Sequence, residues 1–232
     1  MKNQTVVIIP ARGGSVRVPG KNTRDLNGKP LIAWTIRQAI ASGVSSGIFI
    51  STDDDRITEI ATQEGADIIR RPSALAGPES PSEDALLHAL QFLKTDRQWM
   101  PETVVMLQCT SPLRRSQDIA DAVHLFHSSH CGSVLSVVEH RRFVWNGPVD
   151  RPSPVNYDPA HRPRSQDMMP LYLENGSIYV TGCDTLLHSG NRLNPPIRLY
   201  LMPEWSALDI DTEQDFSECR IAMRRYREEL QF

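Results

Sequence analysis

The stretch VVIIPARGGSVRVPGKNTRDLNGKP, residues 6–30, joins a short apolar run to a long polar loop. Residues 6–9 are β-branched without a polar interruption, which predicts a strand buried on both faces, and Pro10 ends it. A polar loop of this length is unusual in a compact domain unless it has a function. The sequence therefore predicts a functional loop directly after a central strand.

The composition of this loop suits an anion. Gly13 and Gly14 permit backbone dihedrals closed to other residues, so successive N–H groups can face one concavity. Residues 10–28 contain one acid, Asp25, and four cations: Arg12, Arg17, Lys21 and Arg24. An oligophosphate is the simplest ligand that needs both features. The alternative is a basic, solvated surface loop.

The glycine spacing excludes two common phosphate loops. A Walker A loop reads G-x-x-x-x-G-K-[ST], but five residues separate Gly14 from Gly20, and Asn22 follows Lys21. A dinucleotide fingerprint needs G-x-G-x-x-G opening directly into a helix, whereas these glycines are adjacent and the helix is expected near Lys29. A nicotinamide-dependent oxidoreductase is therefore disfavoured.

Bulk properties indicate one α/β domain binding a small anion. The chain has 232 residues and a formal charge of -3, which offers no global attraction to nucleic acid or an anionic membrane. No apolar run approaches membrane-spanning length. The first predicted strand, at 6–9, is too short to be the apolar core of a signal peptide. The cysteines lack a C-x-x-C pair, which favours a reducing cytoplasm; they are Cys109, Cys131, Cys183 and Cys219.

Predicted strands and helices alternate along the chain, which predicts a doubly wound, mostly parallel Rossmann-like sheet. The strands are expected at 6–9, 47–52, 66–69, 103–108 and 132–138. The helices are expected at 31–42, 56–64, about 82–93, 116–127 and 213–230, with Ser82 and Ser116 as caps. Residues 139–170 break this pattern with six prolines and interspersed aromatic residues. Such a segment is a disordered arm or an excursion that docks, and we favour docking.

Two acids near the end suit a metal. In an extended segment, Asp209 and Asp211 would share one face, with Leu208 and Ile210 on the other. Two such carboxylates repel unless a cation lies between them, and Mg²⁺ with phosphate oxygens fits that role. The alternative is that Asp211 caps the following helix.

Other candidate metal or catalytic groups have simpler explanations. Asp53 or Asp54 is expected to cap the helix at 56–64, in preference to binding a metal with Asp55. His127, His130 and Cys131 fit the end of a helix better than a zinc site, because no fourth ligand follows nearby. Cys109 is disfavoured as a nucleophile, since no histidine follows at a suitable spacing.

Several motifs, in order over nearly the whole chain, resemble the acylneuraminate cytidylyltransferases, which make CMP-activated sialic-acid-like sugars. The resemblance begins with IPARGGS at 9–15, Pro19, Lys21-Asn22 and GKP at 28–30. It continues with RPSALA at 71–76, QCTSPLR at 108–114, RSQD at 164–167, NGSIY at 175–179 and DID at 209–211. This resemblance implies that the chain converts CTP and a nine-carbon 2-keto sugar acid to a CMP-sugar and pyrophosphate, for bacterial surface glycans such as lipopolysaccharide.

The resemblance also assigns roles to residues. It implies catalytic roles for Arg12, Lys21 and Asp211, and Mg²⁺ held by Asp209 and Asp211. Nucleotide contacts are implied for Ala11, Arg12, Gly13, Gly14, Ser15, Arg17, Lys21, Asn22, Arg71 and Ser82. Sugar contacts are implied for Gln108, Arg164, Gln166, Asn175 and Tyr179. Residues 139–175 would form an inserted dimerisation subdomain within a single domain spanning 1–232, making a cytoplasmic homodimer whose arm reaches the partner's sugar pocket.

Departures from the family pattern keep alternatives open. The family usually has Lys after the loop serine, where this chain has Val16 followed by Arg17, and Cys109 replaces a proline. The loop is also similar to that of the Kdo cytidylyltransferases, although their Ser-Gly-Thr-Asp-Arg segment is absent. A non-catalytic nucleotide-sensing module is the alternative of a different class. The sugar could be N-acetylneuraminate, legionaminate or pseudaminate, and the departures favour legionaminate.

Overall fold

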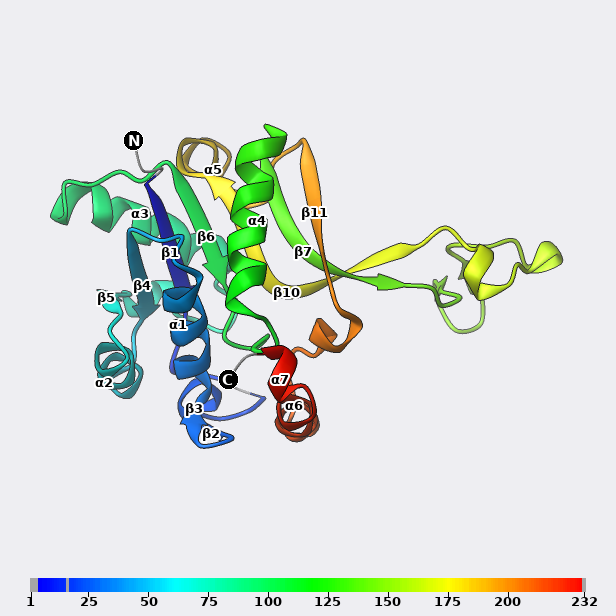
Figure 1. The fold of residues 1–232 in the computed structure, drawn as a ribbon, viewed down its shortest axis with the longest axis horizontal. Coiled ribbons are helices and arrows are strands. Elements are labelled where there is room, and N and C mark those ends of the chain that lie inside the picture. The colour runs from blue at the N-terminus through cyan, green and yellow to red at the C-terminus, as the bar shows by residue number, and fades with distance from the viewer. Residues whose placement is uncertain (1–3, 16, 231–232) are drawn as a thin grey trace.

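Seven strands form one sheet in the computed structural model, which describes residues 4–15 and 17–230 (Figure 1). Their spatial order is β11-β7-β10-β6-β1-β4-β5. Their bounds are β1 Thr5–Pro10, β4 Gly47–Thr52, β5 Asp67–Arg70, β6 Thr103–Leu107, β7 Ser133–His140, β10 Leu171–Gly182 and β11 Ile197–Met202. Val16, one of the departures from the family sequence, lies outside the described residues.

The sheet is mostly parallel, as predicted. Strand β1 pairs in parallel with β4 and β6, β4 with β5, and β11 with β7. Only β10 runs against its neighbours, β6 and β7. Strand β1 is central, and Val6 to Ile9 are fully buried, because side chains on both faces meet a helical layer.

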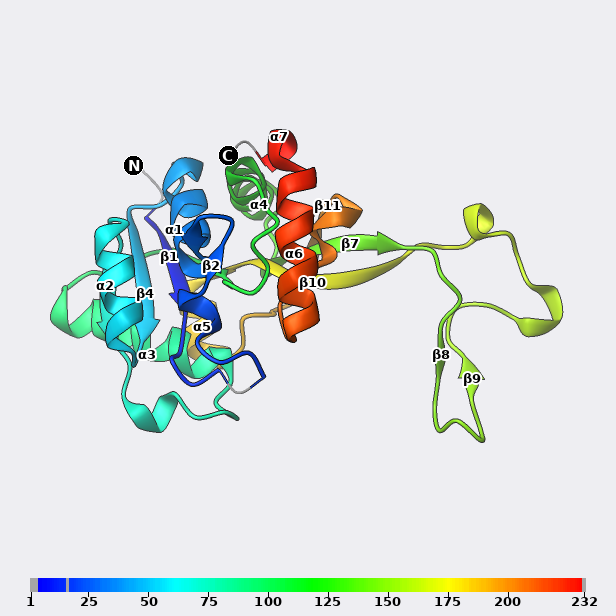
Figure 2. The same cartoon turned by 90° about the horizontal axis from the view of Figure 1, so that it is seen from below.

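Helices cover both faces of the sheet (Figures 1 and 2). Helices α1 (Leu31–Ser42), α2 (Asp55–Gln63) and α4 (Ser116–Ser129) pack on one face, and α3 (Ser82–Asp96) and α5 (Cys183–Ser189) on the other. Helices α6 (Glu213–Arg225) and α7 (Arg227–Leu230) lie below the first group. Short hairpin strands β2 (Asp25–Leu26) and β3 (Lys29–Pro30) precede α1. This is the doubly wound architecture that the sequence predicted.

The helices lie close to their predicted boundaries, but two of the predicted cap residues are wrong. Asp54 caps α2, accepting a hydrogen bond from the Ile57 N–H at 2.8 Å, as one of the two expected options. The serine caps are wrong: Pro81 occupies the cap position of α3. Arg115 does so for α4, with its N–H bonded to the Asp118 carboxylate at 2.8 Å. Ser82 and Ser116 are instead the first residues of their helices.

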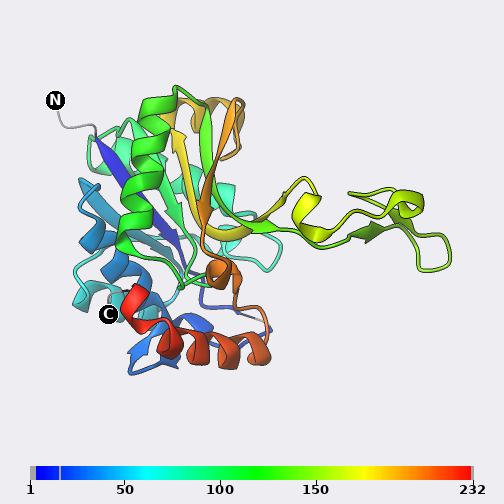
Figure 3. The ribbon, with the colours of Figure 1, turned by 45° about the vertical axis from the view of Figure 1, so that its right-hand side comes forward.

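The segment between β7 and β10 projects from the body as an arm (Figures 1, 2 and 3). It contains the two-residue strands β8 (Trp145–Asn146) and β9 (Ser153–Pro154), which pair with each other. Phe143 and Trp145 each pack edge-on against Tyr157, with ring centroids 4.6 and 5.8 Å away. The predicted boundaries 139 and 175 fall within β7 and β10, where Tyr172 pairs with Glu139 and Glu174 with Val137. The base of the arm is therefore an extension of the main sheet.

Within the described part of the chain, no helix combines the length and apolar character needed to cross a membrane.

Candidate active site

A cleft of about 320 Å³ opens at the carboxyl ends of the parallel strands. Arg12 follows β1, Arg71 follows β5 and Gln108 follows β6. The carboxyl ends of parallel strands share one edge of the sheet, and ligands of open α/β sheets bind there. The predicted residues lining this cleft are Arg12, Ser15, Arg17, Lys21, Asn22, Arg71, Ser82, Gln108, Asp209 and Asp211. The structure thus brings the start and the end of the chain together, as the sequence predicted.

Cations and an acid meet directly in this cleft. Lys21 Nζ lies 3.6 Å from one carboxylate oxygen of Asp211, and Arg17 Nη2 lies 3.1 Å from the other. Lys21 Nζ also donates to the Ile210 carbonyl at 2.6 Å, and its side chain is only 16% exposed. The lysine is therefore held in place, while the more exposed Arg17 is free to change its partner.

The two acids are presented by an extended segment but not by a strand. The segment follows a short 3₁₀ turn at Glu204–Ala207 and is fixed where the Ile210 N–H donates to the Thr110 carbonyl at 2.8 Å. Ile210 is fully buried, so its two neighbours Asp209 and Asp211 face outward into the cleft. The segment belongs to no strand of the sheet, and the alternation of its side chains produces the predicted arrangement.

Asp211 does not cap the following helix. Thr212 caps α6, its hydroxyl accepting from the Asp215 N–H at 3.2 Å. The Asp215 carboxylate accepts in return from the Asp211 and Thr212 N–H groups, at 3.0 and 2.7 Å. The capping alternative is therefore wrong, and the Asp211 carboxylate contacts only cations among the described side chains.

The glycine pair lies beside Asp53, one of the two acids that the sequence predicted as the cap of α2. The Gly13 N–H donates to Asp53 Oδ1 at 3.0 Å, and a Cβ on Gly13 would lie 2.6 Å from Asp54 Oδ2. Gly14 is exposed and has open space around its Cα. One amide of the predicted anion concavity is therefore bonded to a protein carboxylate. Ala11, Gly13 and Gly14 do not line the cleft, and Ala11 is fixed through its N–H bond to the Ser51 carbonyl at 3.0 Å.

Two arginines line the cleft with different degrees of freedom. The Arg71 guanidinium is buried and donates to the Ser51 hydroxyl at 3.0 Å. Burial lowers the pKa of Arg71, the nearby Asp53 raises it, and repulsion by Arg12 lowers it further. Arg12 is half-buried, donates to the Gly77 carbonyl and has its own carbonyl bonded to Asn22 Nδ2 at 3.2 Å. The two positive charges thus converge on one end of the cleft.

Four of the predicted sugar-contacting residues lie away from this chain's own cleft. Arg164 and Gln166 are exposed on the arm, where Arg164 pairs with Asp167 at 2.7 Å. Tyr179 is buried on β10, and its hydroxyl donates to Glu174 at 3.1 Å. Of the predicted sugar-contacting set, only Gln108 lines the cleft.

Asn175 has a structural role in this chain. It is buried, and its carbonyl oxygen accepts from the Ser136 hydroxyl at 2.6 Å while its amide donates to the Ser206 hydroxyl at 3.1 Å. These bonds join β7, β10 and the turn before Asp209. The Asn175 side chain therefore points into the protein interior, contrary to a direct sugar contact.

The family model whose description reads cytidylyltransferase matches residues 6–181. The chain belongs to the cytidylyltransferase family.

Similar proteins in the cytidylyltransferase family are named for two different sugars. It is 33% identical over 216 residues to an N-acylneuraminate cytidylyltransferase of Streptococcus agalactiae serotype V, covering 91% of this chain but 51% of that protein. It thus spans about half the length of that relative. It is 31% identical over 230 residues to a pseudaminic acid cytidylyltransferase of Campylobacter jejuni, covering 95% of this chain and 96% of that protein.

Two solved structures, one named as a synthetase and one as a synthase, share the fold. A CMP:2-keto-3-deoxy-manno-octonic acid synthetase complexed with CTP has a TM-score of 0.69 at 20% identity, covering 96% of this chain and 99% of that one. A 4-diphosphocytidyl-2C-methyl-D-erythritol synthase has a TM-score of 0.71 at 10% identity, covering 96% and 99%. At these identities the likeness supports the Rossmann-like fold alone.

A buried arginine with no role predicted from the sequence lies behind the cleft of this cytidylyltransferase-family chain. Arg114 is fully buried and donates to the Gln108 carbonyl at 3.0 Å, the Gln38 side chain at 2.9 Å and the Thr35 hydroxyl at 2.9 Å. Burial lowers its pKa to about 10, which leaves it protonated at neutral pH. It fixes the segment that carries Gln108 and Ser111. Its place in the QCTSPLR motif was the available signal.

The neighbouring Cys109 lines the cleft as an inert thiol. Burial raises its pKa to about 12, so the reactive thiolate is scarcely populated at neutral pH. This agrees with the prediction that Cys109 is no nucleophile.

The two acids have the donor chemistry for Mg²⁺, provided a substrate supplies further oxygens. Asp209 and Asp211 line the same cleft, and Asp209 Oδ1 accepts from the Ser111 hydroxyl at 3.2 Å. The described residues include no group of three or more His, Cys, Asp or Glu side chains suited to a metal. Mg²⁺ commonly takes one or two carboxylates together with substrate phosphates and water, so these residues fit that ion with a nucleotide.

Proposed function

We propose that this chain transfers CMP from CTP to a nine-carbon 2-keto sugar acid and releases pyrophosphate. The observation that carries the proposal is the single cleft lined by Arg12 and Lys21 from the first loop and by Asp209 and Asp211 from the end of the chain. The names of the Streptococcus and Campylobacter relatives support this class of sugar.

The first loop would bind the triphosphate. Lys21 and Arg17 are paired with Asp211 at 3.6 and 3.1 Å, and an incoming triphosphate offers them a denser negative charge. Their transfer from carboxylate to phosphate would leave Asp211 available for a cation. Arg71 and Ser82, which line the same cleft, would contact the cytosine base.

The reaction would rest on positioning and charge. The sugar's C2 oxygen forms a bond to the α-phosphorus as the bond from the α-phosphorus to the α,β-bridging oxygen breaks; that oxygen leaves with pyrophosphate, and the hydroxyl proton passes to solvent water. Arg12 and Lys21 would stabilise the negative charge that develops on the leaving group. Asp209 and Asp211 would hold Mg²⁺, which supplies charge neutralisation at the phosphate oxygens when bound.

A second copy of the chain would complete the sugar site. Arg164 lies on the arm that projects from the body in Figures 1 and 2 and does not line its own cleft, and its guanidinium fork suits a sugar carboxylate. Strand β11 is a sheet edge with half-exposed apolar side chains, including Leu199 and Leu201, and Tyr172 on β10 is exposed as well. Such an edge is a ready pairing surface, which supports a homodimer.

A substrate panel tests the activity and the sugar. Purified protein, CTP and Mg²⁺ are incubated separately with N-acetylneuraminate, legionaminate, pseudaminate and Kdo, and pyrophosphate release is measured. Turnover with a nine-carbon acid is expected. Preference for Kdo would make the chain a Kdo cytidylyltransferase, and CTP binding without pyrophosphate release from any acid would make it a nucleotide-sensing module. The preference for legionaminate and the cytoplasmic location stay predictions.

A mixing experiment tests the shared site. Arg164→Ala and Asp211→Asn are each expected to abolish most turnover. In a hybrid dimer, one site combines an intact Asp211 with an intact partner arm, so equal mixing after subunit exchange should restore about a quarter of wild-type activity. No recovery in verified hybrid dimers would show that the arm does not serve the partner's site.

A further inference from the structure

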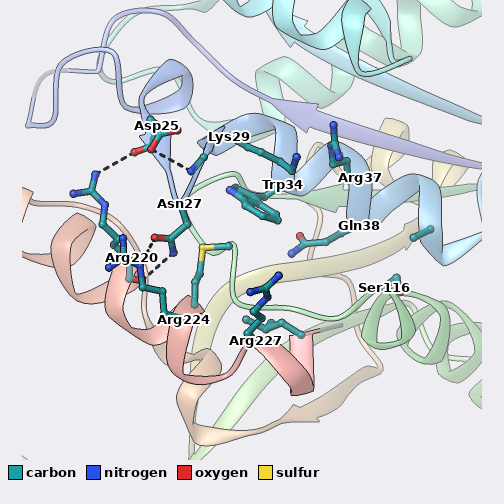
Figure 4. A pocket seen from close by; sticks show the side chains of 14 residues that line it. Asp25, Asn27, Lys29, Trp34, Arg37, Gln38, Ser116, Arg220, Arg224 and Arg227 are labelled. Carbon is teal, nitrogen blue, oxygen red and sulfur yellow. Dashed lines mark hydrogen bonds between the residues drawn. The ribbon is translucent and has the colours of Figure 1, made fainter. Parts of the chain in front are cut away.

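A second and larger cavity lies between the β2–β3 hairpin, α1 and the last two helices (Figure 4). Its volume is about 920 Å³, within the range of small-molecule sites. It shares none of its described lining residues with the cleft that holds Arg12 and Asp211. The proposed cytidylyl transfer therefore gives this cavity no role.

The lining carries a strong excess of positive charge. Five cationic side chains surround one acid, Asp25; they are Lys29, Arg37, Arg220, Arg224 and Arg227. The Asp25 carboxylate accepts from the Gly28 N–H at 3.2 Å. A net surplus of cations on a chain whose formal charge is -3 is a local feature that favours an anionic ligand.

The arginines of α6 are oriented by neutral partners. Arg220 Nη2 donates to the Asp25 carbonyl at 3.1 Å, and Arg224 Nε donates to Asn27 Oδ1 at 2.9 Å. Neither has an ion-pair partner among the described residues. Only Arg37 is neutralised, by Glu64 at 2.6 Å. Figure 4 shows the Arg220 and Arg224 side chains beside the hairpin residues Asp25 and Asn27. Their charge is unpaired among the described residues.

An apolar wall adjoins these charges. Trp34, Met223 and Leu230 line the cavity beside the arginines. Trp34 donates its indole N–H to the Leu26 carbonyl at 2.7 Å, and Lys29 Nζ lies 5.7 Å from its ring centroid. A ligand matching this wall carries a concentrated negative charge together with an apolar or flat part.

We propose that this cavity binds a small phosphorylated metabolite. Guanidinium forks match phosphate oxygens in geometry as well as charge, and three arginines project from one stretch, 220–227. The concave shape and limited volume fit a small molecule better than an acidic peptide or a nucleic acid strand.

The cavity is connected to the cleft by two sets of contacts. Helix α6 carries Arg220 and begins two residues after Asp211, and Arg24, three residues after Lys21, pairs with Glu213 in its first turn. On the other side, Gln38 lines the cavity and accepts from Arg114, which donates to the Gln108 carbonyl. A ligand bridging α6 and the hairpin would restrain elements that carry both halves of the cleft. This link, unlike the binding itself, rests on the proposed function.

Calorimetry with inorganic tripolyphosphate tests the binding. The wild-type chain should bind two equivalents, one in each cavity, and Arg224→Ala/Arg227→Ala should lose one of them or bind it at least about tenfold more weakly. Arg225→Ala, an exposed change on the same helix outside the cavity, is the matched control and should keep both. If the proposed function fails, the wild type still shows one equivalent that the double variant loses.

Two results would overturn the proposal. Equal stoichiometry and affinity in the double variant and the Arg225→Ala control would show that the cavity binds no phosphate. A citrate titration that matches tripolyphosphate and is lost in the same variant would show a general polyanion site. Thermal melts of both variants exclude unfolding as the cause.

Hydrogen exchange tests the connection. In Arg12→Ala/Lys21→Ala, whose cleft lacks two cations, tripolyphosphate should slow amide exchange at 209–216 as well as at 220–230. Slowing confined to 220–230 would contradict the connection to the cleft.

Discussion

Replacing Asp211 by Asn should separate nucleotide binding from turnover. The change removes the charge that Lys21 and Arg17 contact at 3.6 and 3.1 Å while keeping the side-chain shape. The backbone N–H of residue 211 keeps its bond to Asp215 at 3.0 Å, so the start of α6 should be unaffected. We expect a folded protein that binds CTP and transfers CMP poorly.

The contacts set the magnitudes. The Asp211 side chain is 41% exposed and the Arg17 side chain is 69% exposed. Each of the two ion pairs of Asp211 therefore contributes about 0.2–1 kcal/mol to stability. Without Mg²⁺, release of the two cations should tighten CTP binding by about two- to thirtyfold. Loss of a carboxylate at the reacting phosphates should lower turnover by on the order of 10²-fold or more, about 2.7 kcal/mol or more.

The assay measures pyrophosphate release over a range of Mg²⁺ concentrations, with metal-free CTP binding measured by calorimetry. Glu213→Gln is the matched control, because Glu213 pairs with Arg24 at 2.5 Å but does not line the cleft. The control should stay within about twofold of wild type. Near-normal turnover of Asp211→Asn at saturating Mg²⁺ would refute the metal role.

Three further predictions concern the cleft. Lys21→Met should weaken CTP binding and lower turnover together, by at least about tenfold in kcat/KM. The reason is the loss of a 16%-exposed ammonium group that would contact the phosphates. An unchanged kcat/KM would exclude Lys21 from the site. Gly13→Ala should lower the free energy of unfolding by about 1–2 kcal/mol in urea titrations, because the new Cβ would displace the Asp54 cap of α2. Gly14→Ala should leave the free energy of unfolding unchanged, because the space around Gly14 is open. Equal losses in the two variants would contradict this explanation. Cys109→Ser should retain turnover within about fivefold, and alkylation of Cys109 in the folded wild type should stay slow up to pH 9, because burial raises its pKa to about 12.

Local patterns predicted the elements because they are repeated over many residues. The buried run at Val6 to Ile9 and the helical period at Leu31–Ser42 each involve several side chains that favour the same structure. Caps depend on one backbone geometry, which is why Pro81 and Arg115 took positions expected for Ser82 and Ser116.

The parts of the site that lie within one local motif were predictable from the sequence. The contacts between residues that are distant in the sequence were less predictable. The alternation at Asp209–Asp211 predicted the shared direction of the two carboxylates, although a bond to Thr110 rather than a sheet ladder holds the segment. The contact of Asp53 with Gly13 depends on how β4 lies beside β1, and no sequence pattern reports it. The burial of Asn175 likewise depends on the antiparallel pairing of β10 with β7, whose register shifts between Glu174 and Tyr179.

The most direct test is a crystal structure of the protein with a non-hydrolysable CTP analogue and Mg²⁺. The triphosphate should lie within hydrogen-bond reach of Arg12 and Lys21, with the metal bound by Asp209 or Asp211 and the phosphates. A nucleotide bound elsewhere, for instance between the β2–β3 hairpin and α6, with no metal at either acid, would contradict the account.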